Sequence, residues 1–95
     1  MANPVVEGGA YNNLSASGLV RTGVGQLLGI FVASASSSPT IKVWDNTSAA
    51  TTIIVNTFTP IAGQFYVMPF NFGTGLYVTI GGTVDCTVAW LPGGS

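Results

Sequence analysis

Hydrophobic and polar residues alternate with a period of two along most of this chain. The clearest case is segment 83–90, in which every second residue is apolar and the others are small or polar. This alternation predicts a β-strand with one buried face. The apolar residues of that face are Val84, Cys86, Val88 and Trp90. Segment 76–80 alternates in the same way, and Gly81-Gly82 suits a tight turn, so we predict a hairpin over residues 75–91.

A second hairpin is predicted from segments 40–45 and 52–58, which are both rich in β-branched and aromatic residues. Asp45 and Asn46 follow the first segment, and their side chains can hydrogen-bond to the backbone of a turn, which favours chain reversal. The expected core residues of the first segment are Ile41 and Val43, and the expected outward residues are Lys42 and Trp44.

The other expected strands are 11–15, 18–22, 26–33 and 65–69, separated by segments rich in Gly, Pro, Ser and Asn. No segment has a sustained helical pattern. Seven to eight short strands in one chain of 95 residues predict an all-β fold, a small antiparallel β-sandwich of the jelly-roll or Greek-key type. A barrel is the alternative. We expect residues 1–10 to form an extended N-terminal arm and residues 11–95 to form a single domain.

Segment 26–33 departs from simple alternation because both of its faces are apolar. Leu27 and Phe31 lie on one face, and Leu28, Ile30 and Val32 lie on the other. A strand that is apolar on both faces must be covered on both, and a two-layer domain covers only one. The face of Leu27 and Phe31 is therefore a candidate subunit contact, and cover by the N-terminal segment or by a loop is the alternative.

Aromatic residues supply the remaining candidates for a contact surface. They are dense in segment 65–72, one face of which we expect to lie between subunits. The full set of candidate subunit or shell contacts is Val5, Val6, Leu27, Phe31, Phe65, Tyr66, Phe70 and Phe72. Trp44, next to Lys42 and Asp45, is a candidate for stacking on a sugar ring, although a place in the core or in an interface is the more common role for such a residue.

Charge is scarce for a chain that is 47% hydrophobic. The five charged residues are Glu7, Arg21, Lys42, Asp45 and Asp85. A surface with so little charge lacks the repulsion that keeps monomers apart, so we expect the protein to associate with itself or with a larger body. Two isolated cations do not form the basic cluster that nucleic-acid binding needs. We also expect no membrane segment and no secretory signal, and therefore assembly in a cytoplasm.

The residues that usually carry catalysis are mostly missing. There is no histidine, and the three carboxylates have no spacing that suggests paired acid and base groups. Cys86 lies on an apolar strand face, which predicts a buried and unreactive thiol. We expect no enzyme activity, no cofactor and no metal site.

Four segments together resemble small structural proteins of tailed bacteriophages. They are 41–45 with the Ser, Ala and Thr-rich turn that follows, 54–60, 66–70 and 75–88, and the last of these is the most specific. The resemblance covers roughly residues 17–91, and the capsid decoration (cement) proteins are the most similar group. It implies a compact β-fold on the outer surface of the virion head, a homotrimer, and the major capsid protein of the head as partner.

A decoration protein would stabilise the head shell by bridging neighbouring capsomers. We expect the arm, through Val5 and Val6, to reach a neighbouring subunit or the shell. The same resemblance also fits a tail or fibre component that acts as a receptor-binding or glycan-binding module. A self-assembling surface protein of non-viral origin is a third possibility, and it would need an export signal.

Overall fold

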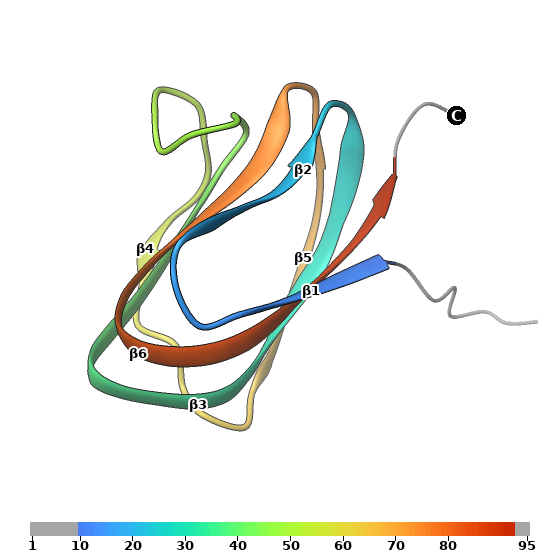
Figure 1. The fold of residues 1–95 in the computed structure, drawn as a ribbon. Coiled ribbons are helices and arrows are strands. Elements are labelled where there is room, and N and C mark those ends of the chain that lie inside the picture. The colour runs from blue at the N-terminus through green and yellow to red at the C-terminus, as the bar shows by residue number, and fades with distance from the viewer. Residues whose placement is uncertain (1–9, 93–95) are drawn as a thin grey trace, which may run out of the picture.

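The computed structural model describes residues 10–92, which form six antiparallel strands with no helix among them (Figure 1). The strands are β1 (Ala10–Leu14), β2 (Gly18–Thr22), β3 (Gly25–Trp44), β4 (Ile53–Phe58), β5 (Phe65–Phe72) and β6 (Gly75–Pro92). The predicted all-β antiparallel fold is confirmed. The strand count is six and not seven or eight, because β3 and β6 each join two segments that the sequence pattern predicts as separate strands.

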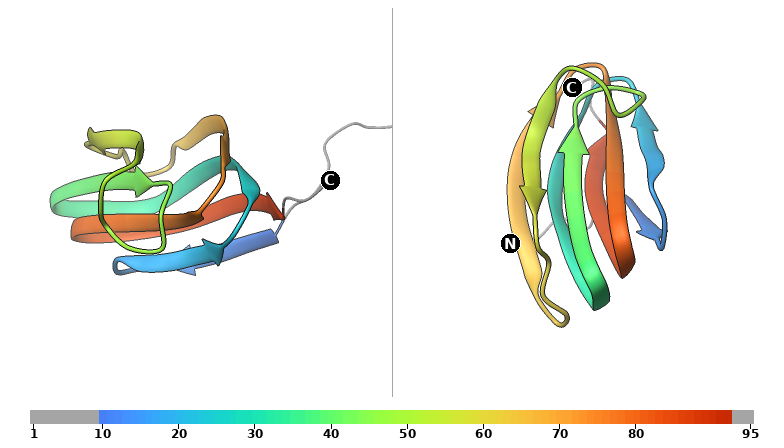
Figure 2. Two further views of the ribbon diagram at one scale, coloured as in Figure 1. Left: turned by 90° about the horizontal axis from the view of Figure 1, so that it is seen from above. Right: turned by 90° about the vertical axis from the view of Figure 1, so that its left-hand side faces the viewer.

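These two long strands bend together, so that each of them contributes to two layers (Figures 1 and 2). Residues 25–32 of β3 pair with β5 and with residues 86–92 of β6, and β1 pairs with this part of β6. Residues 40–44 of β3 pair with β4 and with residues 77–81 of β6, and β2 pairs with the first part of β6. The first layer therefore has the order β5, β3, β6, β1, and the second layer has the order β4, β3, β6, β2.

This strand order is that of a jelly roll. When the halves of β3 and β6 are counted separately, each layer holds four strand segments, and every connection between the described strands crosses from one layer to the other, except the one from β3 to β4. The chain thereby covers the inner side of each layer with the other layer. The outer sides of both layers have no second layer of described residues over them.

The core between the layers is made of apolar side chains from β2, β3, β5 and β6. Its buried members are Val20, Leu27, Ile30, Val32, Ile41, Val43, Met68, Phe72, Leu76, Val78, Val84, Cys86 and Val88. The predicted inner face of segment 83–90 is confirmed, since three of its residues are buried and Trp90 packs against the core. The outcome follows from strict alternation, because β6 has an undisturbed period of two in this segment.

The hairpin predicted over residues 75–91 is wrong. Gly81 and Gly82 do not reverse the chain, because β6 runs on past them and pairs with β3 on both sides. Gly82 has a φ of 71° and lies at the bend, where a Cβ atom would be 2.5 Å from the carbonyl oxygen of Ser37. A tight turn and a sharp bend both need a positive φ and a close backbone approach, so the glycine pair alone does not distinguish them.

The second predicted hairpin is confirmed. β3 and β4 pair antiparallel, with Trp44 opposite Ile53 and Ile41 opposite Phe58. Ile41 and Val43 are fully buried, as their alternation predicts. Asn46 closes the connecting loop, since its side-chain amide donates a hydrogen bond of 2.9 Å to the carbonyl oxygen of Ala50.

Asp45 acts differently from the prediction, because its carboxylate binds a different turn. It accepts hydrogen bonds from the backbone N–H groups of Thr74 at 2.8 Å, Gly73 at 3.1 Å and Gly75 at 3.3 Å, in the turn between β5 and β6. Partial desolvation by itself would raise the pKa of Asp45, but these three hydrogen bonds outweigh it and lower the pKa below 3.8. Asp45 thus joins the loop after β3 to the turn that precedes β6.

We expect Asp45→Ala to lower the free energy of unfolding by about 1 kcal/mol at neutral pH, because hydrogen bonds to a carboxylate are strong but this half-buried carboxylate is still partly screened by solvent. The pKa of Asp45 in the folded state is below its unfolded value. The ionised carboxylate therefore contributes fully to the stability of the folded state above pH 3.8, and this stabilisation is lost as the pH falls through the folded-state pKa. Urea unfolding at several pH values measures the difference. Asp85→Ala is the control, since Asp85 accepts a side-chain hydrogen bond from Asn13 and joins no turns. A difference between wild type and Asp45→Ala that does not shrink below pH 3.8 would contradict this assignment.

The expected N-terminal arm lies outside the described residues, except for Ala10. That residue is the first of β1, where it pairs with Trp90. Strand β1 therefore begins one residue before the boundary that the pattern of alternation predicts between arm and domain.

Candidate interaction surface

The outer side of the first layer carries two rows of residues that run across all four of its strands. In one row Val67, Gly29, Ala89 and Tyr11 stand opposite one another. In the next row the order is Phe65, Phe31, Thr87 and Asn13. Residues directly opposite in an antiparallel pair share one side of the sheet, so the rows form a continuous surface. We call its apolar members the outer apolar face: Tyr11, Gly29, Phe31, Phe65, Val67 and Ala89.

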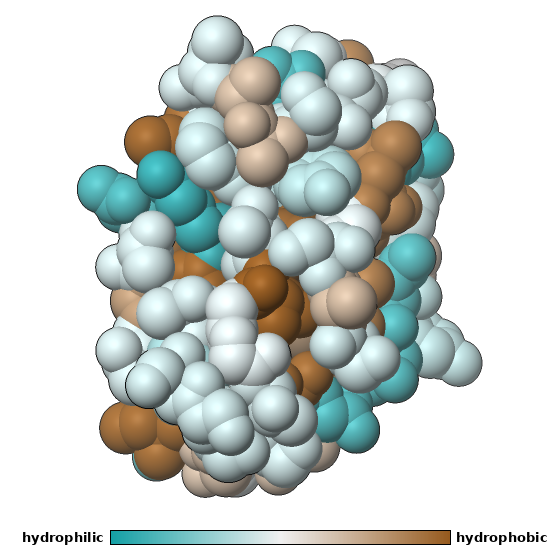
Figure 3. Space-filling model, turned by 60° about the vertical axis from the view of Figure 1, so that its left-hand side comes forward, coloured by the Kyte–Doolittle hydropathy of each residue, from teal (hydrophilic) through white to brown (hydrophobic). Residues whose placement is uncertain are grey.

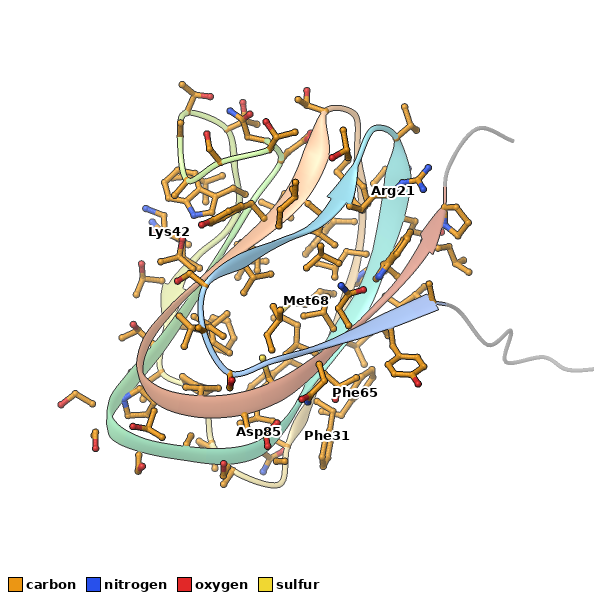
Figure 4. The ribbon with its side chains drawn as sticks, in the orientation of Figure 1. Arg21, Phe31, Lys42, Phe65, Met68 and Asp85 are labelled. Atoms are coloured by element: carbon orange, nitrogen blue, oxygen red, sulfur yellow. The ribbon has the colours of Figure 1, made fainter. Side chains whose placement is uncertain are left out.

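The large side chains of the outer apolar face are well exposed. The exposed fractions are 72% for Tyr11, 70% for Val67, 51% for Phe65 and 42% for Phe31. Phe31 and Phe65 lie side by side, as Figure 4 shows. The ring of Phe65 also covers Gly29, where a Cβ atom would be 2.7 Å from its Cζ. Four large apolar side chains, with the small residues Gly29 and Ala89 between them, form an exposed apolar patch that another molecule could cover.

No charged residue belongs to the two rows that form this surface. Arg21 and Lys42 lie well away from Phe31 and Phe65 (Figure 4). Arg21 stands over the ring of Trp90, with 5.4 Å between its guanidinium carbon and the ring centroid. Asp85 is held by Asn13, whose amide donates to Oδ1 at 2.9 Å, at the rim of the second row. Figure 3 shows the side of the molecule on which the second layer faces the viewer, and there too most of the surface has intermediate hydropathy, with brown apolar patches between smaller hydrophilic areas. Covering the two rows of the first layer requires little desolvation of charge.

The structure places Phe31 where the sequence predicts it and corrects the position of Leu27. Leu27 is fully buried in the core, so it cannot line a contact surface. The reason is a β-bulge between Leu27 and Gly29, where β3 holds one more residue than β6. An extra residue in one strand reverses which side chains face inward, so Leu27 faces the core and Phe31 faces outward.

The candidates on β5 are divided between the two sides of the strand. Phe72 is 2% exposed and belongs to the core, so its prediction as a contact residue is wrong. Phe65 and Val67 are exposed whereas Met68 and Phe72 are buried, so Phe65 and Phe72 face opposite sides of β5. Tyr66 is half-buried against Phe58, with 5.1 Å between the ring centroids, and its hydroxyl accepts a hydrogen bond from the N–H of Ile61. Phe70 is 45% exposed at the edge of the layer.

The outer apolar face also contains residues that the sequence analysis did not select. Tyr11 joins it because β1 pairs with β6 and brings Tyr11 opposite Ala89. Val67 joins it because it is two residues from Phe65 on the same side of β5. Alternation within segment 65–72 could have found Val67, but no local signal could have placed Tyr11. Val5 and Val6 lie outside the described residues.

Trp44 is half-buried on the outer side of the second layer. Its Nε1–H donates a hydrogen bond of 2.9 Å to Oγ1 of Thr79. The ammonium of Lys42 lies 4.3 Å from the centroid of its ring and covers one face of it. This cation–π contact occupies a ring face that a sugar would need for stacking.

The groups that could carry chemistry are separated in the described structure. Cys86 is buried in the core, where desolvation, followed by the charge of Asp85, raises the pKa of its thiol to about 11. Within residues 10–92, His, Cys, Asp and Glu do not form any group of three that could hold a metal ion. No helix long and apolar enough to cross a membrane occurs in this part of the chain.

The chain was also compared with known proteins by sequence and by structure. No protein-family model, curated protein or solved structure matches it.

Proposed function

We propose that this protein is a non-enzymatic structural protein of a bacteriophage virion, and that it decorates the head shell by bridging neighbouring capsomers. The observation that carries the proposal is the outer apolar face, an exposed surface without charge on one side of a jelly roll. Jelly rolls recur in viral capsid proteins, and the resemblance of segments 41–45, 54–60, 66–70 and 75–88 to phage structural proteins supports the same assignment. The major capsid protein is the proposed partner.

The proposed mechanism is physical. A protein that binds the assembled shell, and not the separated capsomers, stabilises the shell by mass action. Many copies on one head add their contributions, and a copy that touches two capsomers couples them. The outer apolar face suits this role because its burial releases water from Phe31, Phe65 and Val67 without desolvating a charge.

Head shells assembled without this protein provide the test. We expect the wild-type protein to bind such shells and to raise the temperature at which they open. The double variant Phe31→Lys/Phe65→Lys should bind at least about tenfold more weakly, because two ammonium groups would be buried at the contact. Both side chains are exposed, so the fold should tolerate the changes. Co-sedimentation with shells measures occupancy, and calorimetry measures the opening temperature.

The matched control is Val24→Lys/Ile61→Lys, which adds the same charge at two residues of similar exposure in the connections between strands. The control should bind shells as the wild type does. Equal binding by all three proteins would contradict the assignment of the outer apolar face, and no binding of the wild-type protein to any shell of its phage would contradict the proposed function.

A further inference from the structure

The outer edge of β1 offers backbone hydrogen-bonding groups that none of the described residues uses. β1 is the last strand of the first layer, and it pairs only with β6 (Figures 1 and 2). The five pairs from Ala10–Trp90 to Leu14–Cys86 follow one another without a register shift. A regular strand of this kind presents a row of N–H and C=O groups along its free edge, and another strand can pair with them.

The other three edges carry features that hinder such pairing. β5 contains Pro69, which has no N–H to donate. β2 contains Arg21 and a register shift between Leu19 and Arg21. β4 is irregular, with two register shifts over its pairing with β3. Charges, prolines and bulges are the devices that protect sheet edges from further pairing, and β1 has none of them among its residues Ala-Tyr-Asn-Asn-Leu.

We propose that β1 is the contact between two copies of this chain, which pair their β1 strands antiparallel about a two-fold axis at Asn12. This register places all five residues of one strand opposite all five of the other, with Tyr11 opposite Asn13 of the second copy. The first layers of the two copies then form one continuous sheet, and the two outer apolar faces form one larger surface. Because each copy uses the only unprotected edge among its described strands, the assembly closes as a dimer.

The side chains of β1 fit this arrangement. Asn12 faces its own chain, where Oδ1 accepts a hydrogen bond of 3.1 Å from Nε1 of Trp90. Tyr11 is 72% exposed on the outer side and would cover part of the second copy. No charged side chain lies within the strand, so the two copies bring no like charges together. The contact does not depend on the proposed role on the head shell, and it differs from the trimer that the resemblance implies.

The test places charges at Tyr11 in the full-length protein. In the proposed register the two Tyr11 side chains are diagonal neighbours across the axis, within reach of long side chains. Tyr11→Lys and Tyr11→Glu should each weaken the dimer on the order of tenfold, because like charges then face each other. An equimolar mixture of the two variants should restore the dimer. Light scattering over a range of concentrations gives the mass, and Val24→Lys is the control for an added exposed charge.

Hydrogen exchange separates this proposal from the other ways to cover the edge. Half of the β1 amides should become protected only at concentrations at which the protein is dimeric. Protection at concentrations at which it is monomeric would show that residues of the same chain cover the edge, and would overturn the proposal. A wild-type monomer, a trimer with unchanged mass in Tyr11→Lys, or a mixture of Tyr11→Lys and Tyr11→Glu that stays monomeric would also overturn it.

Discussion

Leu27→Ala is expected to lower the free energy of unfolding by about 3 kcal/mol, a large part of the stability of a domain of this size. Leu27 is fully buried between the two layers, so truncation removes apolar contacts and leaves a cavity. Strand β3 is held on both sides, by β5 and by β6, so the surrounding backbone has little freedom to close that cavity. Denaturant unfolding followed by tryptophan fluorescence measures the loss.

A comparison with Phe31→Ala tests whether Leu27 and Phe31 face opposite sides of β3. Phe31 is larger than Leu27, but it is 42% exposed, and we expect its truncation to cost less than about 1 kcal/mol. Simple alternation along β3 would put Leu27 and Phe31 on the same side and predict similar losses. Equal losses for the two variants would therefore contradict the β-bulge between Leu27 and Gly29.

The second large effect is expected at the bend of the two long strands. Gly82→Ala should lower the free energy of unfolding by about 3 kcal/mol, because two penalties add. The φ of 71° is unfavourable for alanine, and the new Cβ would lie 2.5 Å from the carbonyl oxygen of Ser37 and 2.8 Å from that of Ser38. Ser37 and Ser38 have positive φ values themselves, so this backbone has little room to move away. Thermal unfolding measures the change.

Substitutions at two other glycines distinguish the cost of the positive φ from the cost of the steric contact. Gly23 has a φ of 99° with nothing within 4 Å of a new Cβ, so Gly23→Ala carries the conformational cost alone, about 1 kcal/mol. Gly73 has open space and no positive φ, and Gly73→Ala should be close to neutral. If Gly82→Ala is no worse than Gly23→Ala, the close approach of β3 and β6 at the bend is not as described.

Alternation predicts the fold where a strand is regular. Val84, Cys86 and Val88 face the core as expected, and so do Ile41 and Val43, because the extra residues at the nearby register shifts lie on the partner strands and leave the period of two in these segments intact. Alternation fails at Leu27 because a bulge is visible only in the pairing of β3 with its neighbours. It fails at Gly81-Gly82 because the choice between a turn and a bend depends on the partner, and the partner residues Ser37 and Ser38 are far away in the sequence.

The outer apolar face could be predicted only in part, because residue types are visible in the sequence whereas strand pairing is not. Phe31 and Phe65 could be selected because each is a large apolar residue in a strand that needs cover on two faces. That they stand opposite each other, with Tyr11 in the adjacent row, follows from the pairing of four strands. The function of this surface, and the contact of β1 with a second copy, remain proposals that the shell-binding and charge-mixing experiments test.

The sequence by itself determined that this is an antiparallel β-protein whose surface carries little charge. Both properties are local, because the charge depends only on residue types and the strands depend on a period of two. Only the tertiary structure decided that eight predicted segments form six strands, which phenylalanines face outward, and which edge is left regular and unprotected. Those features depend on pairs of residues such as Tyr11 and Ala89, which are distant in the chain and meet only when the layers have formed.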